Sequence, residues 1–226
     1  MIKRCRMDVE SLVKQPKISG QVISPIANDF KANLAEFVRS TNVNLELDSV
    51  TLRDSDIRKY FFNGTSNFQV FLSHSSKDKD AVYKFVSYLK QQEGINAFVD
   101  SMVWDNYKDL LNEFAKVCEG QEKLNIAAHL HMILASSLTY MINACDCFIV
   151  LASENSISNG NYTFSPWIYH ELLTASIIPI SSQHLTLALE SAQINFQYSL
   201  NDIIHKFDKQ EFKDIVSWIK NKTMSN

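Results

Sequence analysis

The sequence predicts an α/β fold: an open, mostly parallel sheet of the flavodoxin-like type with helices on both faces, preceded by a small N-terminal α+β attachment. Two observations lead to this prediction. From about residue 68 onwards, short apolar segments rich in β-forming residues alternate with segments of helical periodicity. Such alternation is typical of parallel strands joined by helices. The composition, 46% hydrophobic and 21% charged residues among 226, is that of a globular domain with a buried core.

The first strand–helix–strand unit has the strongest pattern. Residues 68–73 are apolar and predict a buried strand, and residues 95–100 predict a second one. Between them, Gly94 suits the C-terminal stop of a helix. The apolar face of that helix is predicted to hold Val82, Phe85, Val86 and Leu89. Two strands separated by one helix are expected to be parallel, with a right-handed crossover.

The middle of the chain predicts further helix and one more buried strand. Residues 107–117 favour a helix, and a second helix is expected to end near residue 144. The buried face of the second helix is predicted to hold Leu130, Leu134, Leu138 and Met141. Residues 147–152 then predict a third strand, and the Asn- and Ser-rich residues 154–163 predict a loop.

The last third of the sequence continues the alternation. Ser165 and Pro166 suit the N-cap and first residue of a helix that runs to residue 178. Residues 178–180 contain a proline and favour an edge strand, and residues 195–198 favour a last strand. A C-terminal amphipathic helix is predicted from the spacing of Phe212, Ile215, Val216 and Ile219.

Residues 1–66 differ in pattern from the remainder, so we expect an ordered attachment there and the main domain at residues 67–226. A polar turn cluster at 63–67 marks the boundary. The patterned apolar residues of the attachment are Phe30, Leu34 and Phe37, at helical spacing, and Val43, Leu45 and Leu47, which alternate as in a strand. Burying one such side chain contributes about 1.5–3 kcal/mol. We therefore expect the attachment to pack on the main domain or against a second protomer.

Charge, hydropathy and cysteine content exclude several classes of protein. The net charge of −3 and the pI of about 6.1 leave no basic surplus for binding nucleic acid or acidic membranes. The longest apolar run, at 147–152, is far shorter than the roughly 20 residues of a membrane span. Four cysteines without a CxxC pair favour a reducing, cytoplasmic setting and predict no metal site. The five glycines form neither GxGxxG nor a P-loop motif.

Two segments of this sequence resemble the TIR domain family, particularly its bacterial members. Residues 68–80, FQVFLSHSSKDKD, resemble the opening strand and loop of that family, and INAFVD at 95–100 follows at the family's spacing. About 100 residues later, SPWIYHELLTA at 165–175 resembles the WxxxE segment, with Trp167 and Glu171 in its two defining places. The resemblance covers about residues 68–220.

The resemblance implies that the chain cleaves NAD+ between nicotinamide and ribose, with Glu171 as the catalytic residue. Trp167 and Glu171 are four residues apart and therefore share one helix face. The pyridinium leaves as neutral nicotinamide, so that no general acid is required, and a carboxylate can stabilise the oxocarbenium-like ribose. NAD+ is then the substrate, and no cofactor or metal is expected. A solvent-facing helix glutamate is the alternative interpretation of Glu171.

Other residues are predicted to bind the substrate. The loop after the first strand matches the family's nucleotide-contacting loop by position, although it contains no arginine; its candidates are Ser73, His74, Ser75 and Lys77. Helix capping is the alternative role of that loop. Trp104 follows the second strand and is expected to stack on a base, or else to cover the sheet end. Trp167 is expected to orient Glu171 or to anchor its helix. The histidines His129, His131 and His170 are interpreted as structural.

The predicted product is ADP-ribose or a cyclic ADP-ribose isomer. As a TIR-like chain with only a small additional segment, this protein resembles the signal-producing components of Thoeris-type antiphage defence. The resemblance implies a separate effector that responds to the product. The family also implies self-association through TIR domains, with no nucleic-acid or membrane partner. The main alternative is a non-catalytic TIR–TIR assembly or adaptor module. A third is a related nucleoside-hydrolysing or deoxyribosyl-transferring enzyme, which also uses a carboxylate.

Overall fold

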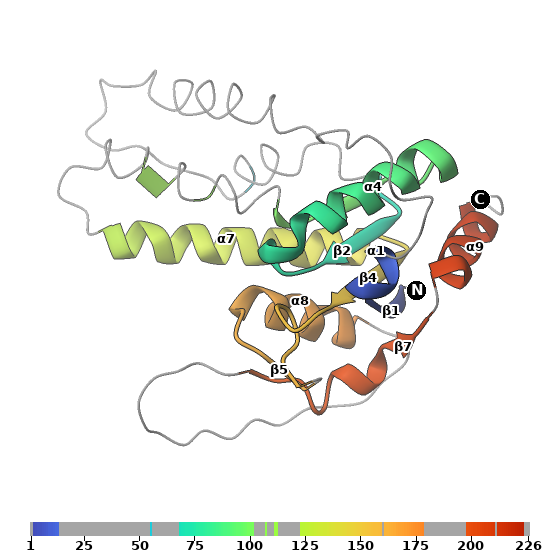
Figure 1. The fold of residues 1–226 in the computed structure, drawn as a ribbon. Helices are drawn as coiled ribbons and strands as arrows, with labels where there is room; N and C mark the ends of the chain where they lie inside the picture. The colour runs from blue at the N-terminus through green and yellow to red at the C-terminus, as the bar shows by residue number, and fades with distance from the viewer. Residues whose placement is uncertain are drawn as a thin grey trace.

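A computed structural model describes residues 2–13, 55, 68–101, 107, 111–112, 123–159, 161–178, 198–210 and 212–223. Within these residues lies a five-stranded sheet in which every pairing is parallel, with the strand order β3-β2-β4-β1-β7 (Figure 1). Its strands are β1 (Lys3–Asp8), β2 (Val70–Ser73), β3 (Ala97–Val99), β4 (Cys147–Ala152) and β7 (Asp208–Lys209). The predicted open α/β fold is therefore confirmed.

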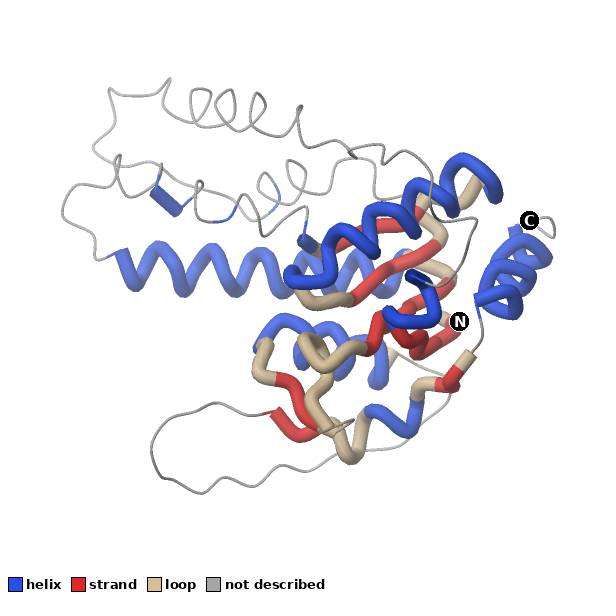
Figure 2. The backbone as a smooth tube through the Cα atoms, in the orientation of Figure 1, coloured by secondary structure: helices blue, strands red, loops and turns tan. Residues whose placement is uncertain are grey.

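Helices cover both faces of this sheet, and a small antiparallel pair of strands lies outside it (Figure 2). Among the described residues, the α-helices with defined bounds are α1 (Val9–Val13), α4 (Lys79–Glu93), α7 (Lys123–Ala144), α8 (Pro166–Ile177) and α9 (Phe212–Thr223). Two short 3-10 helices are η3 (Ser76–Asp78) and η4 (Ile204–Lys206), and the antiparallel pair consists of β5 (Tyr162–Thr163) and β6 (Tyr198–Ser199).

The predicted helix caps are confirmed. Gly94 follows α4 in the left-handed conformation, with φ of 68°, and its N–H donates to the carbonyl of Leu89. Glycine suits this position because it has no Cβ to clash there. At the start of α8, the hydroxyl of Ser165 accepts a hydrogen bond from the N–H of Ile168, and Pro166 is the first helical residue.

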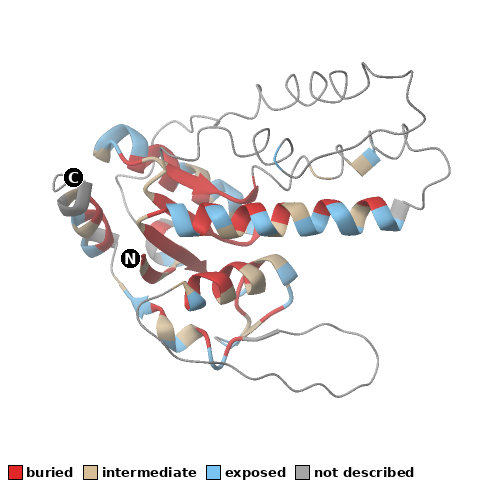
Figure 3. Ribbon diagram, turned by 180° about the vertical axis from the view of Figure 1, so that it is seen from behind, coloured by how far each residue is buried: buried red, intermediate tan, exposed pale blue. Residues whose placement is uncertain are grey.

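The sheet separates two apolar cores because successive strand residues point to opposite faces. On one face, Leu72 and Ile149 pack with residues of α4 and α9. On the other face, Phe71 and Phe148 stack with ring centroids 5.3 Å apart, and residues of α7 and α8 cover them. All six residues of β4 are buried, since this strand lies at the centre of the sheet between the two helical layers (Figure 3).

The N-terminal strand β1 was not predicted. It pairs with β4 from Lys3–Cys147 to Asp8–Ala152 and with β7 on its other side, so it is an inner strand of the main sheet. Cys5 and Met7 are almost fully buried. Residues assigned to the N-terminal attachment thus contribute a strand to the α/β domain. The other patterned residues of the attachment lie outside the described residues, and the division at residue 66 stays a prediction for them.

Two predicted strands differ from the structure. Ile178 is not in a strand but caps the C-terminus of α8, and residues 179–180 lie outside the described part of the chain. The place beside β4 that an additional C-terminal strand would take is filled by β1. Tyr198 begins β6, which pairs with β5 and not with the main sheet, and residues 195–197 are not described. Within 107–117, the described Tyr107, Leu111 and Asn112 are helical.

The position of β1 predicts the effect of shortening Met7. Met7 is 1% exposed and packs in the core beneath α4 and α9, so Met7→Ala is expected to lower the free energy of unfolding by about 2–5 kcal/mol. Met132 on α7 is 67% exposed, and Met132→Ala is the matched control, with an expected change within about 0.5 kcal/mol. Urea unfolding followed by circular dichroism measures both. Equal, small effects would show that β1 is not part of the cooperative core.

Candidate functional site

A row of polar residues crosses the carboxyl ends of the parallel strands on the face covered by α8. Ser73 of β2 pairs with Val150 of β4, and Val150 pairs with Arg6 of β1, so these three side chains point to one face. Asp100 follows β3 and, by strand alternation, shares this face with Phe98. Ser73 is 0% exposed and Asp100 is 4% exposed. This is the edge at which ligands bind in open α/β sheets.

Glu171 projects from α8 into this row. The helix packs on the same face through Ile168 and Leu172, and it contacts β2. Glu171 is 0% exposed, and neither of its carboxyl oxygens makes a hydrogen bond of good geometry within the described residues. The alternative interpretation from sequence was a solvent-facing position for Glu171 on its helix. The structure corrects this expectation, because the side chain is enclosed completely between α8 and the sheet.

Burial sets the protonation of Glu171. Loss of hydration raises the pKa of Glu171 well above its usual value of 4.5, and the adjacent Asp100 raises it further by repulsion. The nearby hydroxyl of Ser73 opposes this shift, because it favours the carboxylate form. Burial therefore favours the protonated acid in the substrate-free site. Strongly shifted carboxyl groups of this kind are typical of catalytic sites.

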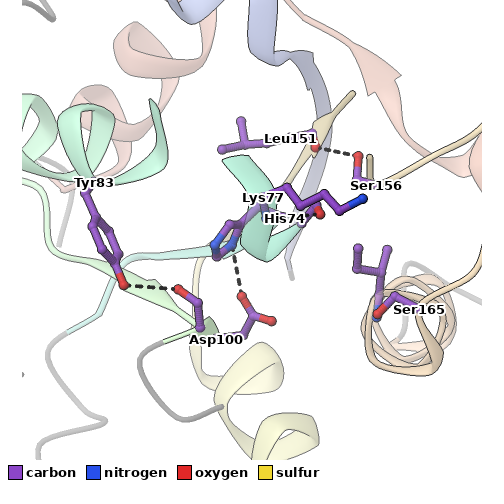
Figure 4. Close-up of polar contacts among 10 residues, drawn as sticks. His74, Lys77, Tyr83, Asp100, Leu151, Ser156 and Ser165 are labelled. Carbon is purple, nitrogen blue, oxygen red and sulfur yellow. Dashed lines mark hydrogen bonds and ion pairs between the residues drawn. The ribbon is translucent and has the colours of Figure 1, made fainter. Parts of the chain in front are cut away.

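His74 is the positive partner of Asp100. Its Nδ1 lies 3.0 Å from Oδ1 of Asp100, and both side chains are buried (Figure 4). Burial alone would lower the pKa of His74, but the charge and hydrogen bond of Asp100 outweigh it, and the pKa is raised above 6.5. His74 was predicted to bind substrate. The structure instead places it against Asp100, which was not among the predicted site residues although it ends a predicted strand.

The remaining predicted residues of this loop divide between capping and exposure. The hydroxyl of Ser75 accepts from the N–H of Lys77 at 3.4 Å and caps η3, which is the alternative role foreseen for the loop. Lys77 is exposed, and its side chain extends toward Ser156 in the loop after β4 (Figure 4). Of the four candidates, only Ser73 is brought beside Glu171.

A polar latch joins the loops that follow β2 and β4. The carboxylate of Asp78 accepts from the hydroxyl of Ser153 at 2.5 Å and from the side-chain amide of Asn155 at 2.9 Å. The Ser153 hydroxyl in turn accepts from the backbone N–H groups of Asn155 and Ser156. The helix that follows β2 covers one face of the sheet, and the helix that follows β4 covers the other. These hydrogen bonds therefore connect the two loops at the topological switch point of the sheet.

Trp167 lies at the contact between α7 and α8. Trp167 is half-buried, and its ring meets His131 edge-on at 5.3 Å, while His131 stacks on Tyr107 at 4.7 Å. Trp167 thus has the packing contacts expected of a helix anchor. His170 also has a structural place, with its Nε2 3.0 Å from the carbonyl of Ala135. Trp104 lies outside the described residues.

No family model, curated protein or solved structure matches this chain. The resemblance to TIR domains therefore stays a prediction that depends on the two sequence segments. In the described ranges, His, Cys, Asp and Glu side chains form no group of three or more that is arranged for a metal ion. None of the described helices combines the length and hydropathy of a membrane span.

The buried acid predicts a pH-dependent change in stability. Since the folded-state pKa of Glu171 lies above 4.5, the folded protein binds more protons than the unfolded one, and stability falls as pH rises above that value. Glu171→Gln removes this loss. The variant should therefore have a higher Tm than wild type at pH 7–8, and the difference should shrink toward pH 4. Calorimetry over this range measures it.

Glu154 supplies the control, because it is exposed in the loop after β4. Glu154→Gln is expected to follow the wild-type dependence of Tm on pH. A Glu171→Gln protein with the wild-type Tm at every pH would contradict the raised pKa of Glu171.

Proposed function

We propose that this protein cleaves the nicotinamide–ribose bond of NAD+ and releases ADP-ribose or a cyclic ADP-ribose isomer, as a defence signal read by a separate effector. The carbon–nitrogen bond at the ribose C1′ breaks, and its electron pair neutralises the pyridinium. Attack on C1′ by water gives ADP-ribose and a proton. Attack by another group of the same molecule gives a cyclic isomer and a proton.

The observation that carries this proposal is the burial of Glu171 beside Asp100. Enclosing two acids against one another lowers the stability of the fold, because like charges in a low-dielectric site cannot both ionise. We take this unfavourable arrangement as a sign that the site serves a purpose. His74 compensates only one of the two charges. The charge of Glu171 is thus left without a compensating partner in the described part of the site. Glu171 also lies on the WxxxE segment that led to the prediction from sequence.

A cationic substrate complements the carboxyl group of Glu171. When the positively charged nicotinamide ring enters, it favours the ionised form of Glu171, whose proton then leaves to solvent. The carboxylate is then placed to stabilise positive charge that develops on the ribose. Asp100, which is fixed by its ion pair with His74, and the hydroxyl of Ser73 lie beside it at the strand ends. Such prior ordering limits reorganisation during the reaction.

Access to Glu171 requires an opening step, because the side chain has no exposed surface. Opening by a partner or a second copy of the chain fits the self-association expected of the family. Large apolar side chains are exposed for such a contact on and beside the helices that flank the site. They are Leu124, Met132 and Tyr140 on α7, Phe164 before α8, and Ile177 at its end. The same surface suits the alternative function, a non-catalytic assembly module.

The first kinetic prediction concerns Glu171→Gln. This change retains the shape of the side chain and removes its charge, so the rate of NAD+ consumption should fall by about 10²–10³, with a smaller change in KM. Wild-type kcat/KM should rise with pH through a pKa above 4.5, because the free site must lose a proton. Chromatography of nicotinamide and ADP-ribose products measures both, with Glu154→Gln as control. Turnover within a few-fold of wild type would reject Glu171 as the catalytic residue.

The second kinetic prediction concerns assembly. If association opens the site, specific activity should rise with protein concentration or with a crowding agent. Met132→Glu, which places a charge on the exposed side of α7, should reduce that rise without lowering Tm. Light scattering and NAD+ consumption are to be measured on the same samples. Constant specific activity in a monomeric sample would contradict the opening step.

A further inference from the structure

Two arginines lie on the face of β1 that α8 covers. Arg4 pairs in register with Phe148 and Arg6 with Val150, and both of these partners belong to the core beneath α8. Arg4 is 8% exposed, and Arg6 is half-buried. A guanidinium does not give up its proton in a protein, so such a site retains positive charge. Burial of that charge is unfavourable unless a negative group lies close to it.

The described residues compensate only part of the positive charge of Arg4 and Arg6. Arg4 donates from Nη2 to the carbonyl of Ile178 at 2.6 Å, at the negative end of the α8 dipole. The Nε atoms of Arg4 and Arg6 are buried without a hydrogen-bond partner. Asp8, the next residue on this face, forms its ion pair with Lys209 at 3.0 Å. In the described part of the chain, neither arginine forms an ion pair with a carboxylate.

Arg6 belongs to the same row of residues as Ser73. Both pair with Val150, one from each side, so their Cα atoms are separated by two strand spacings, roughly 10 Å. Glu171 lies over the Ser73 end of this row, and Asp100 lies beyond Ser73. The row therefore has an acidic end on β3 and a basic end on β1. No arginine is present in the loop after β2, so β1 supplies the guanidinium groups that this loop lacks.

We infer that Arg6, together with Arg4, forms a binding subsite for a phosphate-type anion, and that this subsite holds the pyrophosphate of NAD+. The second half of this statement rests on the proposed function. Guanidinium groups bind phosphate oxygens through paired N–H donors, and the buried Nε atoms are unused donors of this kind. In NAD+, one ribose separates the pyrophosphate from the bond to nicotinamide. The row from Ser73 to Arg6 provides a comparable separation.

Binding of inorganic pyrophosphate and of ADP-ribose to the full chain tests the subsite. Calorimetric titration is expected to show that both bind to wild type and raise its Tm. Arg6→Gln should weaken both by about tenfold to a hundredfold, because it removes a charge-assisted contact. Arg6→Lys retains the charge but loses the paired donors, and it should be intermediate. Lys84→Gln, which removes one charge from the exposed side of α4, is the control and should bind as wild type does.

The outcomes separate the subsite from the proposed function. Pyrophosphate binding that depends on Arg6, without any NAD+ consumption, supports the subsite and rejects the proposed function. NAD+ consumption by Arg6→Gln with the wild-type KM, together with unchanged pyrophosphate binding, overturns the subsite alone. Failure of wild type to bind either anion also overturns it. A folding defect of Arg6→Gln would appear in circular dichroism, and Arg6→Lys then decides the outcome.

Discussion

The pairing of β1 with β4 is the interaction on which both the sheet and the candidate site depend. It joins the N-terminus of the chain to the central strand through the whole length of β1. Without β1, the edge of β4 would be open and β7 would have no neighbour in the sheet. The same pairing brings Arg6 into the row that contains Ser73. One structural contact therefore completes the core and adds positive charge to a site that is otherwise acidic.

The charges of the site explain why the burial of Glu171 lowers the stability of the fold. Asp100 is balanced by His74, and within the described ranges no second cation is paired with Glu171. The pKa of Glu171 is raised, which favours its protonated form and makes folding less favourable as pH rises. Because Glu171 lacks a cationic partner in the described part of the chain, the site is complementary to a cationic ligand. In NAD+, the proposed substrate, the nicotinamide end is positive and the pyrophosphate is negative, and the row is acidic at one end and basic at the other.

Sequence reasoning succeeded where local patterns determine structure. The apolar run at β4, the cap at Gly94 and the start of α8 at Ser165 were all predicted, because burial and capping follow from a few neighbouring residues. The approach of Glu171 to Ser73 followed from placing the site at the strand ends. In contrast, β1 was missed because three of its six residues are basic, and basic residues rarely mark an inner strand.

The other misses depend on long-range contacts. The burial of Glu171 results from the packing of α8 on β2, and the partnership of His74 with Asp100 results from the order of β2 and β3 in the sheet. A single aspartate at a strand end is ordinary in sequence, so nothing local distinguished it. The strand β7 has two exposed residues and no apolar pattern, and it exists only because β1 offers an edge.

The central claim is that Glu171 carries a proton in the free protein and loses it when NAD+ binds. Infrared difference spectroscopy at neutral pH tests this most directly, since protonated and ionised carboxyl groups absorb at different frequencies. The account predicts a protonated carboxyl band in wild type that is absent from Glu171→Gln and disappears when NAD+ is added. A Glu171 that is already ionised in the free protein, or a band that NAD+ leaves unchanged, would contradict it.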